Sequence, residues 1–142
     1  MKRLFVSLLA SLALVGLWTG CTSRQEGLVG LQLELAGIER TAAGAQATFR
    51  VVNPNMVSYN LDNVTYTVAL DGKVVGTAQI KQPTGVPAQQ TIMQTAALVL
   101  APGAVLPVGE ASYRFDAQVL FRLYDEMTEK KKFSGTGRVV VK

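Results

Sequence analysis

Apolar and polar residues alternate along most of the chain from residue 29 onward, and a period of two is typical of strands that bury one face. Val29, Leu31, Leu33 and Leu35 form the first apolar row. The same alternation predicts strands over residues 29–35, 45–51, 64–70, 73–80, 91–100, 113–123 and 133–141. No segment after residue 28 carries apolar residues at helical spacing. We therefore expect an all-β chain whose interior includes Phe49, Tyr66, Val68, Phe115 and Val119.

Strong turn signals separate the predicted strands. Asp71-Gly72 lies between two apolar runs and predicts a two-residue hairpin, because both central positions require positive φ. Asn53-Pro54-Asn55 ends the second strand, while Ala101–Glu110 is expected to be a loop and Asp125–Lys132 a turn. About seven short strands with turns roughly every ten residues fit an antiparallel β-sandwich of the immunoglobulin or fibronectin III type.

Composition narrows the classes of function. The chain has 142 residues, of which 49% are hydrophobic and 17% charged, and this suits one folded domain. The formal net charge of +4 includes Lys2 and Arg3 and is too small to indicate nucleic-acid binding. Histidine is absent and cysteine occurs once, so the commonest general base is missing and a thiolate metal cluster cannot form. We expect no cofactor, no metal site, no catalytic residues and no enzymatic activity.

The first twenty residues are typical of a secretory signal. Lys2 and Arg3 precede an apolar run from Leu4 to Trp18, which is shorter than the roughly 20 residues that a spanning helix needs. The run ends in Leu17-Trp18-Thr19-Gly20-Cys21, which resembles the lipobox of bacterial lipoproteins, with Trp18 where an aliphatic residue is usual. The resemblance implies cleavage before Cys21 and acylation of that cysteine. An ordinary signal peptide with a spare cysteine and an uncleaved anchor are the alternatives.

These features predict a signal peptide over residues 1–20, a lipidated tether over 21–27 and a β domain over 28–142. At no more than about 3.5 Å per residue, the polar tether holds the domain within about 20 Å of the bilayer. Thr22 stands where an Asp favours retention in the inner membrane, so we expect an anchor in the outer membrane, facing the periplasm. The membrane is the expected partner, together with an unidentified envelope protein or lipid.

From Val51-Val52-Asn53-Pro54-Asn55 onward the sequence resembles the group 2 late embryogenesis abundant family, also called the water stress and hypersensitive response domain. Further similarity lies in residues 61–68, in Val74-Val75-Gly76 and in residues 133–139. The resemblance spans nearly the whole mature chain. It implies a fibronectin-like sandwich without enzymatic activity, associated with tolerance of drying and cold. Many members have a short helix where Ala101–Glu110 is predicted to be a loop.

Three polar motifs have structural interpretations. The side chains of Asn53 and Asn55 can hydrogen-bond nearby backbone, so we interpret their motif as a strand end, with contact to a partner as the alternative. Asn63-Val64-Thr65 matches a glycosylation sequon, and we interpret Asn63 as the start of a strand. Gly135-Thr136-Gly137 precedes a strand, which favours a bulge or a close backbone approach over a phosphate-binding loop.

Charged residues gather before the last predicted strand. Glu126, Glu129 and Lys130–Lys132 predict a solvated tip, with contact to anionic lipid as the alternative. The candidates for an acid/base pair of carboxylates are Asp116, Asp125, Glu126 and Glu129, but their spacing does not require them to converge.

The leading hypothesis is a non-enzymatic, lipid-anchored envelope protein that protects surface components under water stress. The alternative is an adaptor that docks an envelope complex through a sheet edge or its loops. A hydrolase or another enzyme is disfavoured by the missing histidine and by the lack of a nucleophile arrangement.

Overall fold

The computed structural model describes residues 30–123 and 127–142, and within these ranges every regular element is a β-strand. The strands are β1 (Gln32–Thr41), β2 (Gly44–Val52), β3 (Tyr59–Leu70), β4 (Lys73–Ile80), β5 (Thr84–Val86), β6 (Thr91–Leu100), β7 (Gly109–Leu123) and β8 (Met127–Val141). The expectation of an all-β fold is confirmed for these residues. The predicted start of the first strand at Val29 lies outside the described residues.

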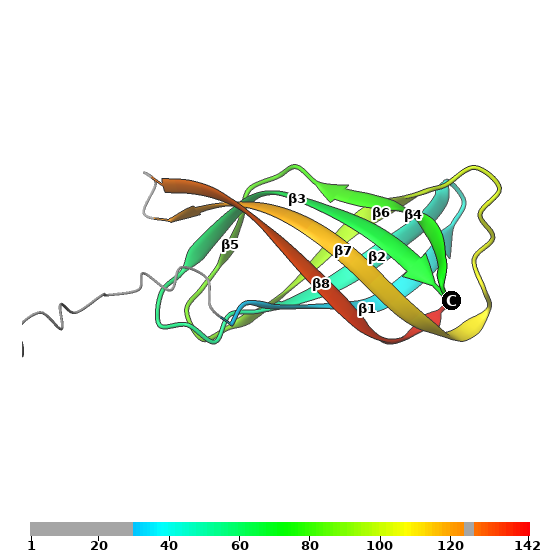
Figure 1. Ribbon diagram of the computed structural model, residues 1–142, viewed down its shortest axis with the longest axis horizontal. Helices are drawn as coiled ribbons and strands as arrows, with labels where there is room; N and C mark the ends of the chain where they lie inside the picture. The colour runs from blue at the N-terminus through cyan, green and yellow to red at the C-terminus, as the bar shows by residue number, and fades with distance from the viewer. Residues whose placement is uncertain (1–29, 124–126) are drawn as a thin grey trace, which may run out of the picture.

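The strands form one closed, barrel-like sheet (Figure 1). They pair in the order β4-β6-β2-β1-β8-β7-β3, and β3 also pairs with β4, which completes the ring. The short strand β5 pairs with the first residues of β3, beyond the part that β4 occupies. Neighbouring strands are antiparallel except β1 and β8, which are parallel.

The closed ring corrects the predicted immunoglobulin or fibronectin III-like sandwich of two separate sheets. Two connections cause the difference, because β4 pairs with β3 on one side and with β6 on the other, and β1 pairs with β8. Its approach to β6 requires Gly76, where a Cβ atom would lie 2.3 Å from the carbonyl oxygen of Val99. Alternation along a strand predicts which side chains are buried, but it does not show which strand edges meet.

Several strand boundaries agree with the prediction and others do not. Strands β4 and β6 have the predicted bounds, whereas β5 was not predicted. The predicted Asp125–Lys132 turn is wrong over its described part, because β8 begins at Met127 and pairs with β7 back to Leu123. The Ala101–Glu110 segment is a loop without a helix up to Val108, and β7 then begins at Gly109.

The predicted hairpin at Asp71-Gly72 is confirmed. Asp71 has a φ of 46° and Gly72 a φ of 81°, and the flanking residues Leu70 and Lys73 pair with each other. The Asp71 carboxylate also accepts hydrogen bonds from Ser112, at 2.9 Å from the hydroxyl and 3.0 Å from the backbone N–H. These two bonds attach the hairpin to the start of β7 and lower the pKa of Asp71.

The centre of the core is a cluster of three aromatic rings. Phe49 stacks on Tyr66 with ring centroids 3.6 Å apart, and Phe115 meets the two rings edge-on at 6.0 and 5.8 Å. All five residues predicted to lie inside have 0% exposure. The Tyr66 hydroxyl lies 3.4 Å from Oε1 of the buried Gln94, and burial raises the pKa of Tyr66.

The two ends of the sheet differ in their closure. At the end that holds the C-terminus, Ile38 of β1 pairs with Val141 of β8, and the backbones of Arg40 and Lys142 add a hydrogen bond of 2.9 Å. At the other end lie the 53–58 loop, β5 and the start of β8, and β1 also begins there (Figure 1). The first half of β8 pairs only with β7 among the described strands.

Candidate functional site

The Asn53-Pro54-Asn55 motif is the polar centre of the loop between β2 and β3. Asn53 is fully buried, and its Oδ1 accepts hydrogen bonds from the backbone N–H and the side-chain amide of Asn55, each at 3.0 Å. Its Nδ2 donates to three carbonyl oxygens, those of Val57 at 2.8 Å, Pro87 at 3.0 Å and Val86 at 3.3 Å. The amide oxygen therefore binds Asn55 within the loop, and the amide nitrogen binds the loop and the end of β5. Asn53 thus holds the loop in place.

The 53–58 loop is fastened to the segment between β5 and β6. Asn53 donates its backbone N–H to Gln90 at 2.9 Å, and Gln89 donates its own to the carbonyl oxygen of Asn55 at 3.0 Å. Gln89 has a φ of 55°, which turns the segment towards the loop. Gly30 lies near this loop, since a Cβ atom built on it would lie 3.1 Å from the Pro54 ring. The loop thus stands where the described chain begins.

The two glycines of Gly135-Thr136-Gly137 lie on the inward-facing row of β8, opposite the buried Phe115 and Tyr113. A Cβ atom on Gly135 would lie 2.6 Å from the ring of Phe115, and one on Gly137 would lie 2.9 Å from that of Tyr113. The rings of β7 therefore lie against the glycines of β8, although Gly137 stays exposed, an arrangement known for glycines in sheets. The β7–β8 register has no shift, so the predicted bulge is wrong. The predicted close approach is found, but the atoms nearest the two glycines belong mainly to side chains and not to backbone.

Strand alternation splits the charged run that precedes the last predicted strand. Glu129 and Lys131 lie opposite the buried Phe121 and Val119, so both belong to the inward-facing row. They form an ion pair of 3.9 Å, and the Lys131 ammonium lies 6.0 Å from the centre of the Phe121 ring. Lys130 and Lys132 belong to the outward-facing row and are exposed. The predicted solvated tip is thus a strand with two different faces.

An ion pair between Asp62 and Arg122 lies at the same end of the sheet, and the sequence did not indicate it. Arg122 donates from Nε at 3.0 Å and Nη2 at 2.9 Å to one oxygen of Asp62. Asp62 is the extra residue at a register shift between β3 and β7, and its side chain is only 15% exposed. A bulge of this kind interrupts the alternation, so the pattern could not predict that Asp62 faces Arg122.

The carboxylates considered for acid/base chemistry do not converge where they are described. Asp116 lies opposite Ser134, and Glu129 lies opposite Phe121, so about 17 Å of strand separates them. Each has a basic neighbour instead, Arg114 at 3.5 Å from Asp116 and Lys131 at 3.9 Å from Glu129. Asp125 and Glu126 lie outside the described residues. Within residues 30–123 and 127–142, no group of three His, Cys, Asp or Glu side chains is placed to hold a metal ion.

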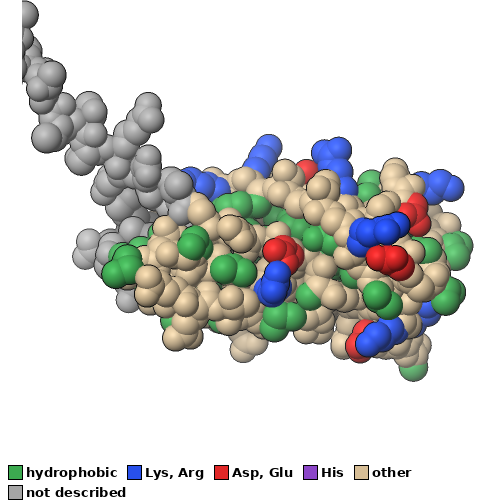
Figure 2. Space-filling view, turned by 90° about the horizontal axis from the view of Figure 1, so that it is seen from below, with side chains coloured by type: hydrophobic (Ala, Val, Ile, Leu, Met, Phe, Trp, Pro, Cys, Tyr) green, Lys and Arg blue, Asp and Glu red, His purple; other side chains and the backbone are tan. Residues whose placement is uncertain are grey.

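Many surface charges lie beside a charge of opposite sign. Arg50 forms an ion pair with Glu34, and Arg138 lies 3.8 Å from Glu110. On the face drawn in Figure 2, acidic side chains lie against basic ones, other basic side chains stand alone along the upper edge, and apolar side chains are scattered between them.

Asn63 of the sequon lies inside β3 and not at its start, and its Oδ1 accepts a hydrogen bond from Gln79 at 3.4 Å.

Cys21, the predicted site of acylation, lies outside the described residues, as do the predicted signal peptide and tether. In the part of the chain that the structure describes, no helix has the length and apolar character needed to cross a bilayer.

Comparison with known proteins gives one family. The family model described as "Late embryogenesis abundant protein" matches residues 48–139, a range that contains the Asn53-Pro54-Asn55 motif and the two glycines of β8. No curated protein matches the chain.

Solved structures of similar fold have low sequence identity. The solution structure of a candidate late embryogenesis abundant (LEA) protein is 12% identical, with a TM-score of 0.51, and the match covers 96% of this chain and 83% of that chain. A crystal structure from Archaeoglobus fulgidus is 14% identical, with a TM-score of 0.44 and coverage of 80% and 97%. A solution structure from Arabidopsis thaliana is 17% identical, with a TM-score of 0.48 and coverage of 78% and 79%. Only the LEA protein structure has a TM-score above 0.5, and at 12% identity it supports a shared fold and nothing more.

Proposed function

Because the chain belongs to the late embryogenesis abundant protein family, we propose that it is a non-enzymatic envelope lipoprotein that protects surface components during water stress. The family match over residues 48–139 is the observation that carries this proposal. The lipobox-like Leu17-Trp18-Thr19-Gly20-Cys21 supports the anchor, and the scattered carboxylates of the described domain support action without turnover. In this proposal the acylated Cys21 holds the domain at the outer membrane, facing the periplasm.

A survival assay tests the proposal. Deleting the gene should lower survival after drying or osmotic shock, and the wild-type chain should restore it. A chain with Asp116, Asp125, Glu126 and Glu129 all neutralised should also restore survival, since no carboxylate acts as an acid or base in the proposal. The Cys21→Ala chain should fail, because an untethered domain loses the high local concentration that a short linker gives.

Two outcomes would contradict the proposal. Loss of rescue on neutralising a single carboxylate, in a chain whose circular dichroism spectrum is unchanged, would indicate an enzyme. Normal survival of the deletion strain under every stress would remove the protective role, and a stoichiometric partner captured by crosslinking in cells would then favour an adaptor.

The adaptor is kept as a second candidate because of one observation on β8. The first half of this strand pairs with β7 alone among the described strands, and an unpaired strand edge can accept an extended segment of another protein. The lysines of this half weigh against the adaptor, because charged side chains commonly protect exposed edges from pairing.

A further inference from the structure

The outward face of β4, β3, β7 and β8 carries rows of mostly polar side chains in the half of the sheet that contains β5 and the start of β8. In one row Asn63, Leu120 and Lys130 are register partners. In the next row Gln79, Thr65, Gln118 and Lys132 are partners across all four strands. Lys81 follows the last residue of β4, and the β3–β4 register places it next to Asn63, so it extends the first row beyond β3. The strand spacing of about 4.8 Å places Lys81 and Lys130 about 14 Å apart.

Lys81, Lys130 and Lys132 are exposed, and none of them forms an ion pair with a carboxylate in the described ranges. The acidic groups nearby are already engaged. Glu129 pairs with Lys131 on the inward-facing row, and Asp62 pairs with Arg122. Asp116, further along the face, lies 3.5 Å from Arg114. Three ammonium groups on one face therefore keep their full charge available for an anionic partner.

Neutral hydrogen-bonding groups lie between the lysines. Lys130 borders a hollow of about 170 Å³ that is also lined by Asn63, Thr65, Gln118 and Leu120. Lys132 borders a second hollow, of about 260 Å³, lined by Thr65, Thr67, Asp116 and Gln118 among others. Amide and hydroxyl groups beside an ammonium suit an anion whose oxygens accept several hydrogen bonds, such as a phosphate.

We propose that Lys81, Lys130 and Lys132 form a headgroup surface, which contacts the phosphates of anionic lipids in the bilayer to which the chain is tethered. The proposal rests on the proposed function for the tether. The route of the chain favours lipid over other anions, because Gly30 lies near the Pro54 ring, in the loop at the end where β8, with Lys130 and Lys132, begins. Only a few residues separate Gly30 from Cys21, so the end that carries the headgroup surface stays close to the bilayer.

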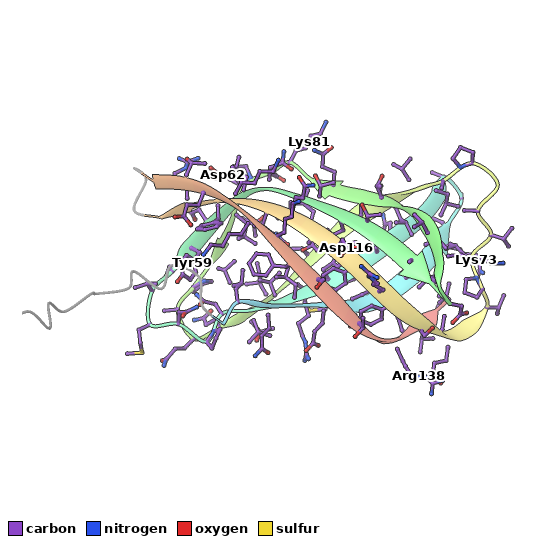
Figure 3. All side chains as sticks on the ribbon, in the orientation of Figure 1. Tyr59, Asp62, Lys73, Lys81, Asp116 and Arg138 are labelled. Atoms are coloured by element: carbon purple, nitrogen blue, oxygen red, sulfur yellow. The ribbon has the colours of Figure 1, made fainter. Side chains whose placement is uncertain are left out.

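Each lysine near an anionic surface strengthens association by about fivefold at moderate ionic strength. Three lysines alone give weak binding, and the tether makes it effective by holding the surface near the lipid. The contact then orients the domain, and its strength falls as salt is added because exposed charges are screened. Lys73, at the other end of β4, lies away from the surface (Figure 3), as does the C-terminal residue Lys142 (Figure 1), and both serve as internal controls.

Lysine footprinting on vesicles tests the headgroup surface. A chain from Thr22 onward retains every core residue, since these lie between Leu31 and Val141. A histidine tag before Thr22 attaches it to vesicles that contain nickel-chelating lipid, so the tether does not depend on acylation. Acetylation of each lysine is then followed by mass spectrometry on phosphatidylglycerol-containing and on purely phosphatidylcholine vesicles. We expect acetylation of Lys81, Lys130 and Lys132 to slow severalfold on the anionic vesicles only, with Lys73 and Lys142 unchanged.

Paired variants sharpen the test. Lys130→Gln with Lys132→Gln should abolish the protection of Lys81, whereas Lys73→Gln with Lys142→Gln, which removes the same charge, should leave it intact. Equal protection of all lysines, no protection, or equal loss in both variants would overturn the headgroup surface. Equal protection by soluble polyglutamate would overturn it in favour of an acidic protein partner. Protection of the surface together with an unacylated Cys21 in cells would refute the anchor of the proposed function alone.

Discussion

The side chain of Asn53 requires both halves of its amide. Its nitrogen donates to three backbone carbonyl oxygens, and its oxygen accepts from two nitrogens of Asn55. An aspartate has nearly the same shape but no donor, so its carboxylate would face the three carbonyl oxygens without compensation. A buried polar group that loses its partner costs about 1–3 kcal/mol, and more when it is charged.

Asn53→Asp should therefore lower the free energy of unfolding by about 3 kcal/mol. Urea denaturation at pH 7 measures the change. Asn60→Asp, an exposed substitution of the same chemistry on β3, should change stability by less than about 0.5 kcal/mol. A stability change for Asn53→Asp as small as that of Asn60→Asp would show that the hydrogen bonds of the loop contribute little.

Asp71 predicts a pH dependence. The Ser112 hydroxyl, and then its backbone N–H, hold the pKa of Asp71 below the usual value of 3.8. A carboxylate with a lowered folded-state pKa stabilises the fold above pH 3.8, and this contribution is lost as the pH falls through the lowered pKa.

Asp71→Asn keeps a residue that tolerates the positive φ of this turn, so it isolates the effect of the carboxylate. The wild-type chain should be more stable than the variant at pH 5–7, and its advantage should shrink below pH 3.8. Thermal unfolding between pH 7 and pH 2 follows the difference. A constant difference down to pH 2 would contradict the assignment.

At the scale of strands, the sequence predicted burial well and pairing poorly. The inward rows of β2, β3 and β7 follow from alternation, and Asn53-Pro54-Asn55 correctly marks the end of β2. The first half of β8 lacks alternation because its inward row contains Glu129 and Lys131, which form an ion pair beside Phe121. This part of β8 therefore had the composition of a turn. Strand β5 has three residues, too few to show any period.

The candidate site was predictable to a similar degree. The sequence marked the Asn53 loop and the lysine run, because both have unusual composition. It could not place Lys81 and Lys130 on one face of the sheet, since that arrangement depends on the register of β4, β3, β7 and β8. It also could not show that the lysine run is divided between two faces, because a turn has no fixed alternation.

The pairing of β7 with β8 predicts unequal effects for the two glycines of β8. A Cβ atom on Gly135 would lie 2.6 Å from Phe115, whose ring is fully buried and has no room to move. Gly137→Ala meets Tyr113, which is 8% exposed and can shift towards solvent. Gly135→Ala should lower the free energy of unfolding by about 1–3 kcal/mol.

Gly137→Ala should cost less than Gly135→Ala, and Thr136→Ala, on the exposed row between them, less than about 0.5 kcal/mol. Urea denaturation of the three variants gives the order. Equal effects at Gly135 and Thr136 would mean that the rings of β7 do not pack on β8 in solution.

At the scale of the whole molecule, the arrangement links the family domain to its proposed position. The domain has one core inside a closed sheet. Gly30 lies near Pro54 at the end where β8, with Lys130 and Lys132, begins, and Lys81 lies nearer the middle of the molecule's length (Figure 3). A short tether leaves little freedom for the other end, with Lys73 and the C-terminus, to reach the same bilayer. The proposed anchor and the headgroup surface therefore act on the same side of the molecule.

The anchor itself leads to the last prediction, which is fatty-acid labelling at Cys21. This is the single cysteine of the chain, so Cys21→Ala should abolish labelling by an alkyne fatty acid and move the protein from the membrane pellet to the soluble periplasm. Thr22→Ala alters the adjacent residue and should keep both the label and the membrane location. Trp18→Leu restores the aliphatic residue usual in a lipobox and should speed conversion of the precursor to the mature chain. A soluble wild-type chain, or equal labelling of the wild-type and Cys21→Ala chains, would contradict the anchor. The domain would then have no reason to act at the membrane surface.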